Sequence, residues 1–158
     1  MSADLRPLVI LDAGVFISDA LGANRGASSQ VLALAASGTC VPVLSADLWD
    51  EVQEKLVDKG EMSLAEIAER YGGIVVAAIW VEPVRETQEH LQFVGGDADD
   101  TVLPRMAEAV YGAAPEQSAT EHKYIVSLNR KHVRPGSAWA GFLCVTPHGL
   151  ITRLTDED

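Results

Sequence analysis

Four short runs of apolar residues restrict this chain of 158 residues to few architectures. They occupy residues 8–11, 40–45, 123–129 and 141–147, and the first reads Leu-Val-Ile-Leu. Continuous apolar runs of this length are typical of strands that are buried on both faces of a sheet. Segments with helical patterning separate the runs, which favours parallel strands with helices on both faces. We therefore predict an α/β fold, a three-layer α/β/α sandwich around a mostly parallel sheet of four or five strands.

Capping residues predict where the intervening helices begin. Ser28 or Ser29 is expected to cap a helix that ends at Gly38, after a loop over residues 18–27. The next helix is expected to follow Ser45.

Three later segments are less regular. The sequence Ser-Leu-Ala-Glu at 63–66 is a capping box that predicts the start of a helix. Residues 72–84 could continue this helix or form a strand, and residues 60–95 as a whole are poorly assigned. Residues 97–112 resume a helical pattern, in which Pro104 is tolerable only if the regular helix begins near it. Pro42 argues against a central strand at 40–45, unless its missing donor faces an edge or a bulge.

Composition sets the broad class of protein. With 47% hydrophobic and 22% charged residues, the chain suits one globular domain, residues 1–158 with a core at about 8–151. It contains no apolar run long enough for a membrane span, and its first residues do not resemble a secretory signal. Cys40 and Cys144 lie among apolar neighbours, which suggests buried, reduced thiols in a cytoplasmic protein.

The net charge of −11 has two interpretations. It could simply keep the protein dispersed, or it could reflect carboxylates gathered around a divalent cation. Total charge does not distinguish them, so the positions of the acidic residues matter.

Acidic and polar residues follow the predicted strands. In parallel α/β sheets, ligands bind beyond the carboxyl ends of the strands. The first strand leads into Asp12, and the second into Ser45 with Glu51 shortly after. The residues expected at this rim are Asp12, Glu51, Asp97, Asp99, Asp100, Ser127 and Asn129.

Each of these residues also has a structural explanation. Asp12 could cap a helix, and Glu51 precedes Lys55 by four residues, the spacing of an intrahelical ion pair. The Asp-Ala-Asp-Asp sequence at 97–100 could be a solvated helix start, and Asn129 a turn residue. Their shared placement at strand ends is what favours a functional site.

The order of these motifs resembles the PIN domain family, in particular its VapC-like toxin ribonucleases, from about residue 8 to 151. The motifs are VILDAGVFIS, SADLWDEVQEKL, DADDTVL, YIVSLNRKHV and VTPHGLI. Gly14 stands where the family most often has Asn, and Asn129 where many members have Asp. The register leaves Asp99 and Asp100 as equal candidates, with Asp97 as a weaker third.

The resemblance implies metal-dependent hydrolysis of phosphodiester bonds in single-stranded RNA. It assigns Asp12, Glu51, Asp99 and Asp100 as metal ligands, and these residues with Asn129 as the catalytic set. Clustered carboxylates repel one another unless a cation balances them, and Mg²⁺ or Mn²⁺ suits an all-oxygen site. Scattered histidines argue against zinc. We expect one metal to be well occupied, and a second only with substrate.

The resemblance also implies partners. Arg130, Lys131 and Arg134 follow the third strand and could guide RNA phosphates together with Ser127, although an ordinary solvated loop fits them nearly as well. The toxins of this family usually form homodimers and are inhibited by an antitoxin that covers the acidic cleft.

Of three alternatives, two are disfavoured by missing residues and one stays open. A haloacid-dehalogenase-type phosphatase requires a second Asp where Gly14 stands, and a response-regulator receiver requires a Lys at the end of its last strands, where Phe-Leu-Cys-Val-Thr-Pro has none. The third is a PIN-like module that has lost activity and serves as a binding or scaffold domain, which Gly14 and Asn129 would favour.

Overall fold

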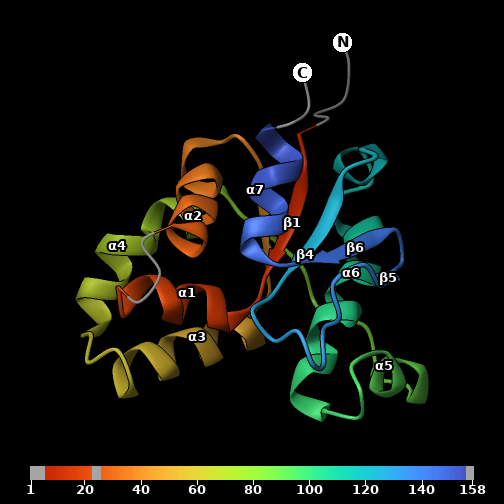
Figure 1. The fold of residues 1–158 in the computed structure, drawn as a ribbon, viewed down its shortest axis with the longest axis horizontal. Coiled ribbons are helices and arrows are strands. Elements are labelled where there is room, and N and C mark those ends of the chain that lie inside the picture. The colour runs from red at the N-terminus through yellow and green to blue at the C-terminus, as the bar shows by residue number, and fades with distance from the viewer. Residues whose placement is uncertain (1–5, 23–25, 156–158) are drawn as a thin grey trace.

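The computed structural model describes residues 6–22 and 26–155. Figure 1 shows the course of the chain. Its elements are β1 (Leu8–Leu11), α1 (Ala13–Ala20), α2 (Ala27–Ser37), β2 (Val41–Leu44), α3 (Ala46–Asp58), α4 (Leu64–Ala77), β3 (Ile79–Trp80), α5 (Gln88–Phe93), the 3₁₀ helix η1 (Ala98–Thr101), α6 (Val102–Ala113), the 3₁₀ helix η2 (Gln117–Ala119), β4 (Lys123–Val126), β5 (Ala138–Trp139), β6 (Phe142–Val145) and α7 (Pro147–Thr155).

The strands form one mixed sheet in the order β3-β2-β1-β4-β6-β5. Neighbouring strands are parallel, except that β5 runs antiparallel to β6. The predicted fold class is confirmed, with six strands in place of four or five. The additional strands, β3 and β5, have only two residues each and form the two edges of the sheet.

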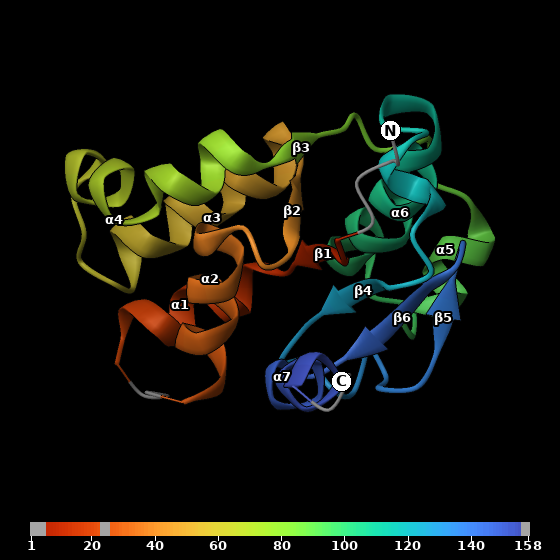
Figure 2. The ribbon, with the colours of Figure 1, turned by 90° about the horizontal axis from the view of Figure 1, so that it is seen from above.

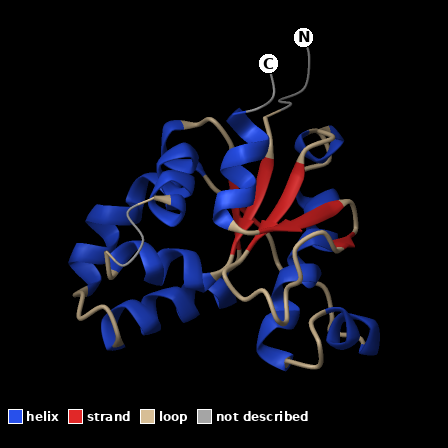
Figure 3. Ribbon diagram, in the orientation of Figure 1, coloured by secondary structure: helices blue, strands red, loops and turns tan. Residues whose placement is uncertain are grey.

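Helices cover both faces of the sheet (Figure 3). The view from above shows α6 and α7 on opposite sides of the strands (Figure 2). Helix α7 packs on β4, β6 and α2, whereas α6 packs on β1, β5 and α5. All four residues of β1 are fully buried between these layers, as a continuous apolar run predicts.

Pro42 lies in β2, which is an interior strand. The Val41 N–H donates to Pro7 O on the β1 side, so the nitrogen of the next residue faces the opposite side. On that side β3 pairs only with Val43 and Leu44. The missing donor of Pro42 therefore faces an unpaired stretch of strand edge and leaves no ladder bond unmade.

The segment that sequence reasoning left open contains both a helix and a strand. Ser63 and Glu66 form the predicted capping box at the start of α4. The helix then continues through Gly72 and Gly73, anchored by buried Tyr71 and Ile74 on its inner face, and the chain enters β3 two residues after Ala77. Tertiary burial compensates here for the poor helix propensity of paired glycines.

Other predicted boundaries hold in part. The Ser45 hydroxyl caps α3, and Gly38 ends α2 in the left-handed region with φ of 87°. Pro104 is in the first turn of α6, where its missing N–H costs nothing.

Two local predictions are wrong. Helix α2 begins at Ala27, its N-cap is Gly26, and Ser28 lies inside the helix, fully buried. Helix α1 extends to Ala20, so the expected loop begins later than residue 18, and its residues 23–25 lie outside the described part of the chain.

Both thiols are free and buried, as predicted, and burial raises the pKa of Cys40 to about 11. Among the helices of residues 6–22 and 26–155, none combines the length and apolar character that a bilayer span needs.

The glycines allow a test of this account of α4. Gly73 is an exposed position inside the helix, and a Cβ there meets nothing within 4 Å. We expect Gly73→Ala to raise the free energy of unfolding by roughly 0.5–1 kcal/mol in a denaturant titration. Gly141→Ala is the opposing control, because φ is +82° there and the Cβ would lie 2.8 Å from Tyr111 Oη. Equal effects of the two substitutions would contradict the helical assignment of 72–73.

Candidate active site

Asp12 links the end of β1 to the start of α1. Its backbone N–H donates to Val126 O of β4, 3.0 Å away, which continues the parallel pairing one residue past the strand. Its side chain caps α1, with Oδ1 accepting from the Ala13 N–H at 2.8 Å. Oδ2 accepts from the Ser127 hydroxyl at 2.8 Å. The capping interpretation is thus correct, and it leaves the carboxylate at the rim of the sheet.

Glu51 lies in α3, seven residues before the helix ends, and is half-buried. Its Oε2 pairs with Lys55 Nζ at 2.9 Å, the intrahelical pair that the spacing predicts. This hydrogen bond is the largest of the influences that raise the pKa of Lys55, and the charges of Asp12 and Asp99 act in the same direction. Lys55 is therefore close to the acidic residues from other elements.

The acidic segment before α6 is held by its own 3₁₀ turn. Asp97 is the N-cap of η1, and its Oδ1 accepts from the Asp99 N–H at 3.0 Å. The three carboxylates then diverge: the oxygens of Asp97 and Asp100 approach His132, whereas Asp99 faces the α3 side.

Ser127 and Asn129 connect the end of β4 to these acids. The Asn129 N–H donates to Ser127 Oγ at 3.0 Å, and Ser127 in turn donates to Asp12. The Asn129 amide donates from Nδ2 to Asp100 Oδ2 at 3.1 Å. A chain of hydrogen bonds thus runs from Asp12 to Asp100 through the loop after β4.

One cavity of about 410 Å³ collects these residues at the carboxyl end of the sheet. It is lined by Asp12, Gly14, Glu51, Lys55, Asp97, Asp99, Asp100, Leu128 and Asn129. The five residues predicted as a catalytic set therefore share one pocket, although they come from four separate parts of the chain.

The surroundings of this pocket disfavour the ionised form of two of its carboxylates. Burial raises the pKa of Asp12, against the hydrogen bonds from Ser127 and Ala13 that lower it. Burial, together with the charges of Asp12 and Asp97, raises the pKa of Asp100 to about 6. Neighbouring negative charges disfavour ionisation in this way unless a cation compensates them.

A model of a protein family, described as PIN domain, matches residues 8–131. The chain belongs to the PIN domain family. Comparison with curated proteins and with solved structures gives no match. PIN domains are typically metal-dependent nucleases, and an acidic cluster in this PIN domain could bind a metal.

Four residues that were predicted to bind substrate do not line the 410 Å³ cavity, which we call the PIN pocket. Ser127 is buried beneath it, in contact with Asp12. Arg130, Lys131 and Arg134 are exposed on the turns after β4, and none of them lines the cavity. Their role toward phosphates stays a prediction.

Three residues in this region of the PIN domain are not in the predicted set. The sequence predicts Lys55 only as the helical ion-pair partner of Glu51, because its position in the pocket depends on how α3 packs against α1. Asp97 ranked below Asp99, yet its Oδ2 is 3.0 Å from His132 Nδ1. His132 follows Asn129 by three residues, a spacing at which an Asn side chain can accept a hydrogen bond from the backbone N–H of the later residue. This spacing is the sequence signal that could have identified His132.

Lys55 neutralises part of the PIN pocket and competes with any cation for Glu51. We expect Lys55→Gln to tighten Mn²⁺ binding about fivefold or more, since a unit charge about 4 Å away contributes on the order of 1 kcal/mol even in water. Isothermal titration calorimetry measures the change. Lys59→Gln removes the same charge from an exposed position outside the pocket and should leave affinity unchanged. Unchanged Mn²⁺ affinity in Lys55→Gln would show that the charge of Lys55 does not influence metal binding.

The raised pKa of Asp100 gives folding stability a pH dependence. Between the ordinary carboxyl pKa of 3.8 and about 6, the folded protein holds a proton that the unfolded chain has released. Through this group the metal-free protein therefore loses stability as the pH rises through that window.

We expect Asp100→Asn to remove this loss. In the presence of a chelator it should melt at a higher temperature than the wild type at about pH 7.5, by roughly 2–4 °C for each kcal/mol gained. The difference should vanish near pH 4. A stability difference that is the same at both pH values would show that the charge of Asp100 is not the cause.

Proposed function

We propose that this PIN domain is a metal-dependent endoribonuclease that hydrolyses phosphodiester bonds of single-stranded RNA. The observation that carries the proposal is the shared pocket of Asp12, Glu51, Asp99, Asp100 and Asn129 at the carboxyl end of the sheet. Family membership supports the nuclease chemistry. RNA as the substrate, in preference to DNA, is part of the proposal.

The donor set fits Mg²⁺ or Mn²⁺. Asp12, Glu51 and one or both of Asp99 and Asp100 would hold the ion, because hard divalent cations prefer carboxylate oxygens. Burial raises the pKa of Asp12 and of Asp100, and neighbouring negative charges add to the shift; a bound cation would favour the ionised form of both carboxylates. When bound, the metal supplies charge stabilisation for the phosphate and activates water at neutral pH.

The chain's own residues orient this set. Ser127 fixes the carboxylate of Asp12 by donating to Oδ2, which leaves Oδ1 beside the start of α1. Asn129 holds Asp100 through its amide N–H, so a neutral side chain stands where a further carboxylate would add repulsion. Lys55 restrains Glu51 at 2.9 Å. We assign Arg130, Lys131 and Arg134 to the approach of the RNA backbone, from their exposure after β4.

We further propose that the protein is a VapC-like toxin of a type II toxin–antitoxin pair, acting in the cytoplasm as a homodimer. The net charge of −11 favours a basic antitoxin as partner. A second, larger and open hollow of about 940 Å³, where the end of α3 meets the start of α4, supports a basic partner, because its lining combines apolar and acidic residues. The lining comprises Gln53, Glu54, Val57, Asp58, Glu61, Met62, Ser63, Leu64 and Glu66.

Cleavage of labelled single-stranded RNA in the presence of Mn²⁺ tests the proposed activity. We expect Asp12→Asn to lose on the order of a hundredfold or more of the rate, because Asn retains the cap of α1 but removes the negative charge. Asp58→Asn, at an exposed position near the end of α3, should cleave like the wild type.

Two results would contradict the proposal. Inactivity of the wild type, without calorimetric metal binding, would favour the inactive scaffold module. Equal cleavage by wild type and Asp12→Asn would point to a contaminating nuclease. A parallel reaction with single-stranded DNA of the same sequence decides whether RNA is the preferred substrate.

Brief expression in a bacterial host tests the toxin assignment. We expect growth arrest and one discrete new fragment in total cellular RNA, both absent with Asp12→Asn. Normal growth with an intact RNA profile, at confirmed expression of a protein that cleaves RNA in vitro, would contradict the toxin role alone.

A further inference from the structure

His90 is a buried polar residue that the proposed reaction does not use. It lies in α5, and its side chain keeps only 2% of its surface exposed. Of the six residues of α5, all of which the structure describes, His90 alone is buried. A helix this short is not stable by itself, so its place on the protein depends on tertiary contacts. His90 is therefore the principal anchor of α5.

Both ring nitrogens of His90 have a defined partner. Nδ1 accepts the backbone N–H of Thr87, the N-cap of α5, at 2.9 Å. Because a backbone N–H can only donate, the neutral ring carries its proton on Nε2. Nε2 is 2.9 Å from Glu108 Oε1 and donates to this carboxylate. One imidazole thus caps its own helix and binds to α6.

The partner of His90 is itself held in place. Glu108 lies in α6, and its Oε1 also accepts from Trp139 Nε1 of β5 at 2.8 Å. The Trp139 and His90 rings lie against each other, with centroids 5.2 Å apart and an angle of 49° between the ring planes. We call the hydrogen bond between His90 and Glu108 the α5–α6 link. It joins two helices, and β5 supports it.

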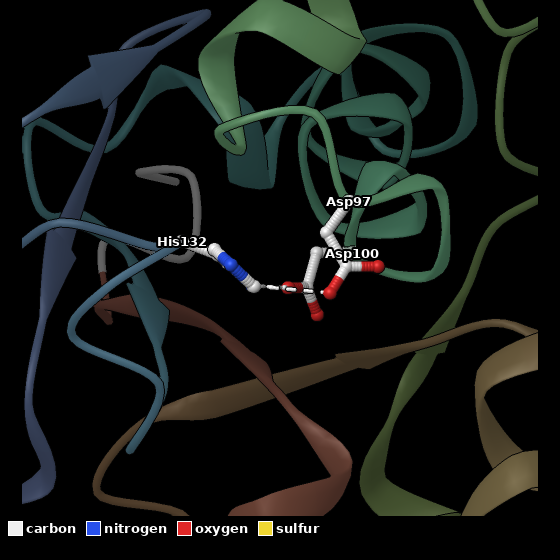
Figure 4. Close-up of side chains that lie close together, drawn as sticks. All are labelled: Asp97, Asp100 and His132. Atoms are coloured by element: carbon white, nitrogen blue, oxygen red, sulfur yellow. Dashed lines mark ion pairs between the residues drawn. The ribbon is translucent and has the colours of Figure 1, made fainter.

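The α5–α6 link closes the loop that carries acidic residues of the PIN pocket. Its two residues are 18 positions apart in the sequence, and the acidic turn at 97–100 lies between them. Figure 4 shows Asp97 and Asp100 projecting from this turn toward His132. The turn continues into α6 without a break, because η1 ends where α6 begins. One end of the acidic turn is therefore fixed to α6.

The other end of the acidic turn is joined to α5 by backbone hydrogen bonds. The Gly96 N–H donates to Leu91 O at 2.7 Å. The Asp97 N–H donates to Val94 O at 3.4 Å. Gly95 and Gly96 have φ of 68° and 88°, which lets the chain reverse directly after the helix. The position of α5 therefore sets the position of Asp97, and the α5–α6 link sets the position of α5.

We propose that His90 and Glu108 are positioning residues for the nuclease reaction, because their hydrogen bond holds α5 against α6 and so fixes the acidic turn at the pocket. The inference rests on the proposed function, since it requires the carboxylates of the turn to take part in cleavage. The lining of the PIN pocket, as the structure describes it, contains neither residue. They act through the backbone between them, and a displacement of about 1 Å can lower a rate on the order of a hundredfold.

Three substitutions of Glu108 separate the hydrogen bond from the charge. Glu108→Ala removes the acceptor, and Glu108→Asp keeps the charge but shortens the side chain by one methylene. Glu108→Gln loses the charge but keeps an oxygen at the same reach, so it can still accept from His90. With single-stranded RNA and Mn²⁺, we expect kcat to fall on the order of tenfold in Glu108→Ala and Glu108→Asp, and KM to change by less than about twofold. Glu108→Gln should stay near the wild type.

Tyr71→Phe controls for a loss of stability alone. It removes a hydroxyl that donates to Asp19 Oδ2 at 2.7 Å, in a contact between α4 and α1. This variant should melt at a lower temperature than the wild type, as Glu108→Ala should, but its kcat should not change. A melting curve for each variant establishes that the assay temperature lies below its transition.

Amide hydrogen exchange, followed by NMR, tests the positioning without RNA or metal. The Asp99 and Asp100 amides donate within the turn, to Oδ1 and to the backbone oxygen of Asp97. We expect both amides to exchange on the order of tenfold faster in Glu108→Ala and Glu108→Asp than in the wild type. Exchange in Glu108→Gln should match the wild type.

Unchanged exchange in folded Glu108→Ala and Glu108→Asp, or a fall in kcat no greater than that in Tyr71→Phe, would overturn the proposal. An equal loss of kcat in Glu108→Gln would assign the effect to the charge and would also overturn it. A wild-type protein that cleaves no RNA, although the Glu108 variants show the expected exchange, would contradict the proposed function while the role of the α5–α6 link in holding the acidic turn stands. Cleavage by the wild type with unchanged exchange in the variants would contradict this inference alone.

Discussion

Burial of neighbouring carboxylates is the constraint around which the carboxyl end of this sheet is built. Parallel strands bring Asp12 and the segment before α6 to one rim, where burial, with a smaller contribution from neighbouring negative charges, raises the pKa of Asp12 and of Asp100. The protein offsets part of this cost with its own groups: hydroxyl and amide donors from the loop after β4, and the ammonium group of Lys55. These groups balance the cluster only partly, which leaves it prepared for a divalent ion.

The loop after β4 makes the geometry of the pocket depend on how the strands of the sheet pair. Ser127 follows a strand that pairs with β1 on one side and β6 on the other. From this fixed position the hydrogen bonds of Ser127 and Asn129 reach acids that are far away in sequence. A small shift between β1 and β4 would therefore change the separation of the carboxylates, so the geometry for metal binding depends on strand register.

The sequence predicts most of the fold because its signals are local and strong. Buried strands appear as continuous apolar runs, and the caps at Ser45 and Ser63 depend on residues within one turn. Ser28 misleads because a hydroxyl near a helix start is also small enough to be buried inside the helix, where packing decides.

The sequence also predicts which residues lie together at the pocket, although their roles stay a prediction. Strand ends identify Asp12, Glu51, Asp100 and Asn129 as neighbours, because topology alone places them together. Which of the acids at 97–100 meets His132 depends on the direction of single side chains in a 3₁₀ turn, and that is set by contacts such as Gly95 against the ring. Asp12 both caps α1 and lines the pocket, and this has a consequence for evolution. A descendant without nuclease activity would still need a polar N-cap at this position. Ionised Asp100 lowers the stability of the metal-free fold. Retention of Asp100 among descendants would therefore indicate selection for activity more clearly than retention of Asp12.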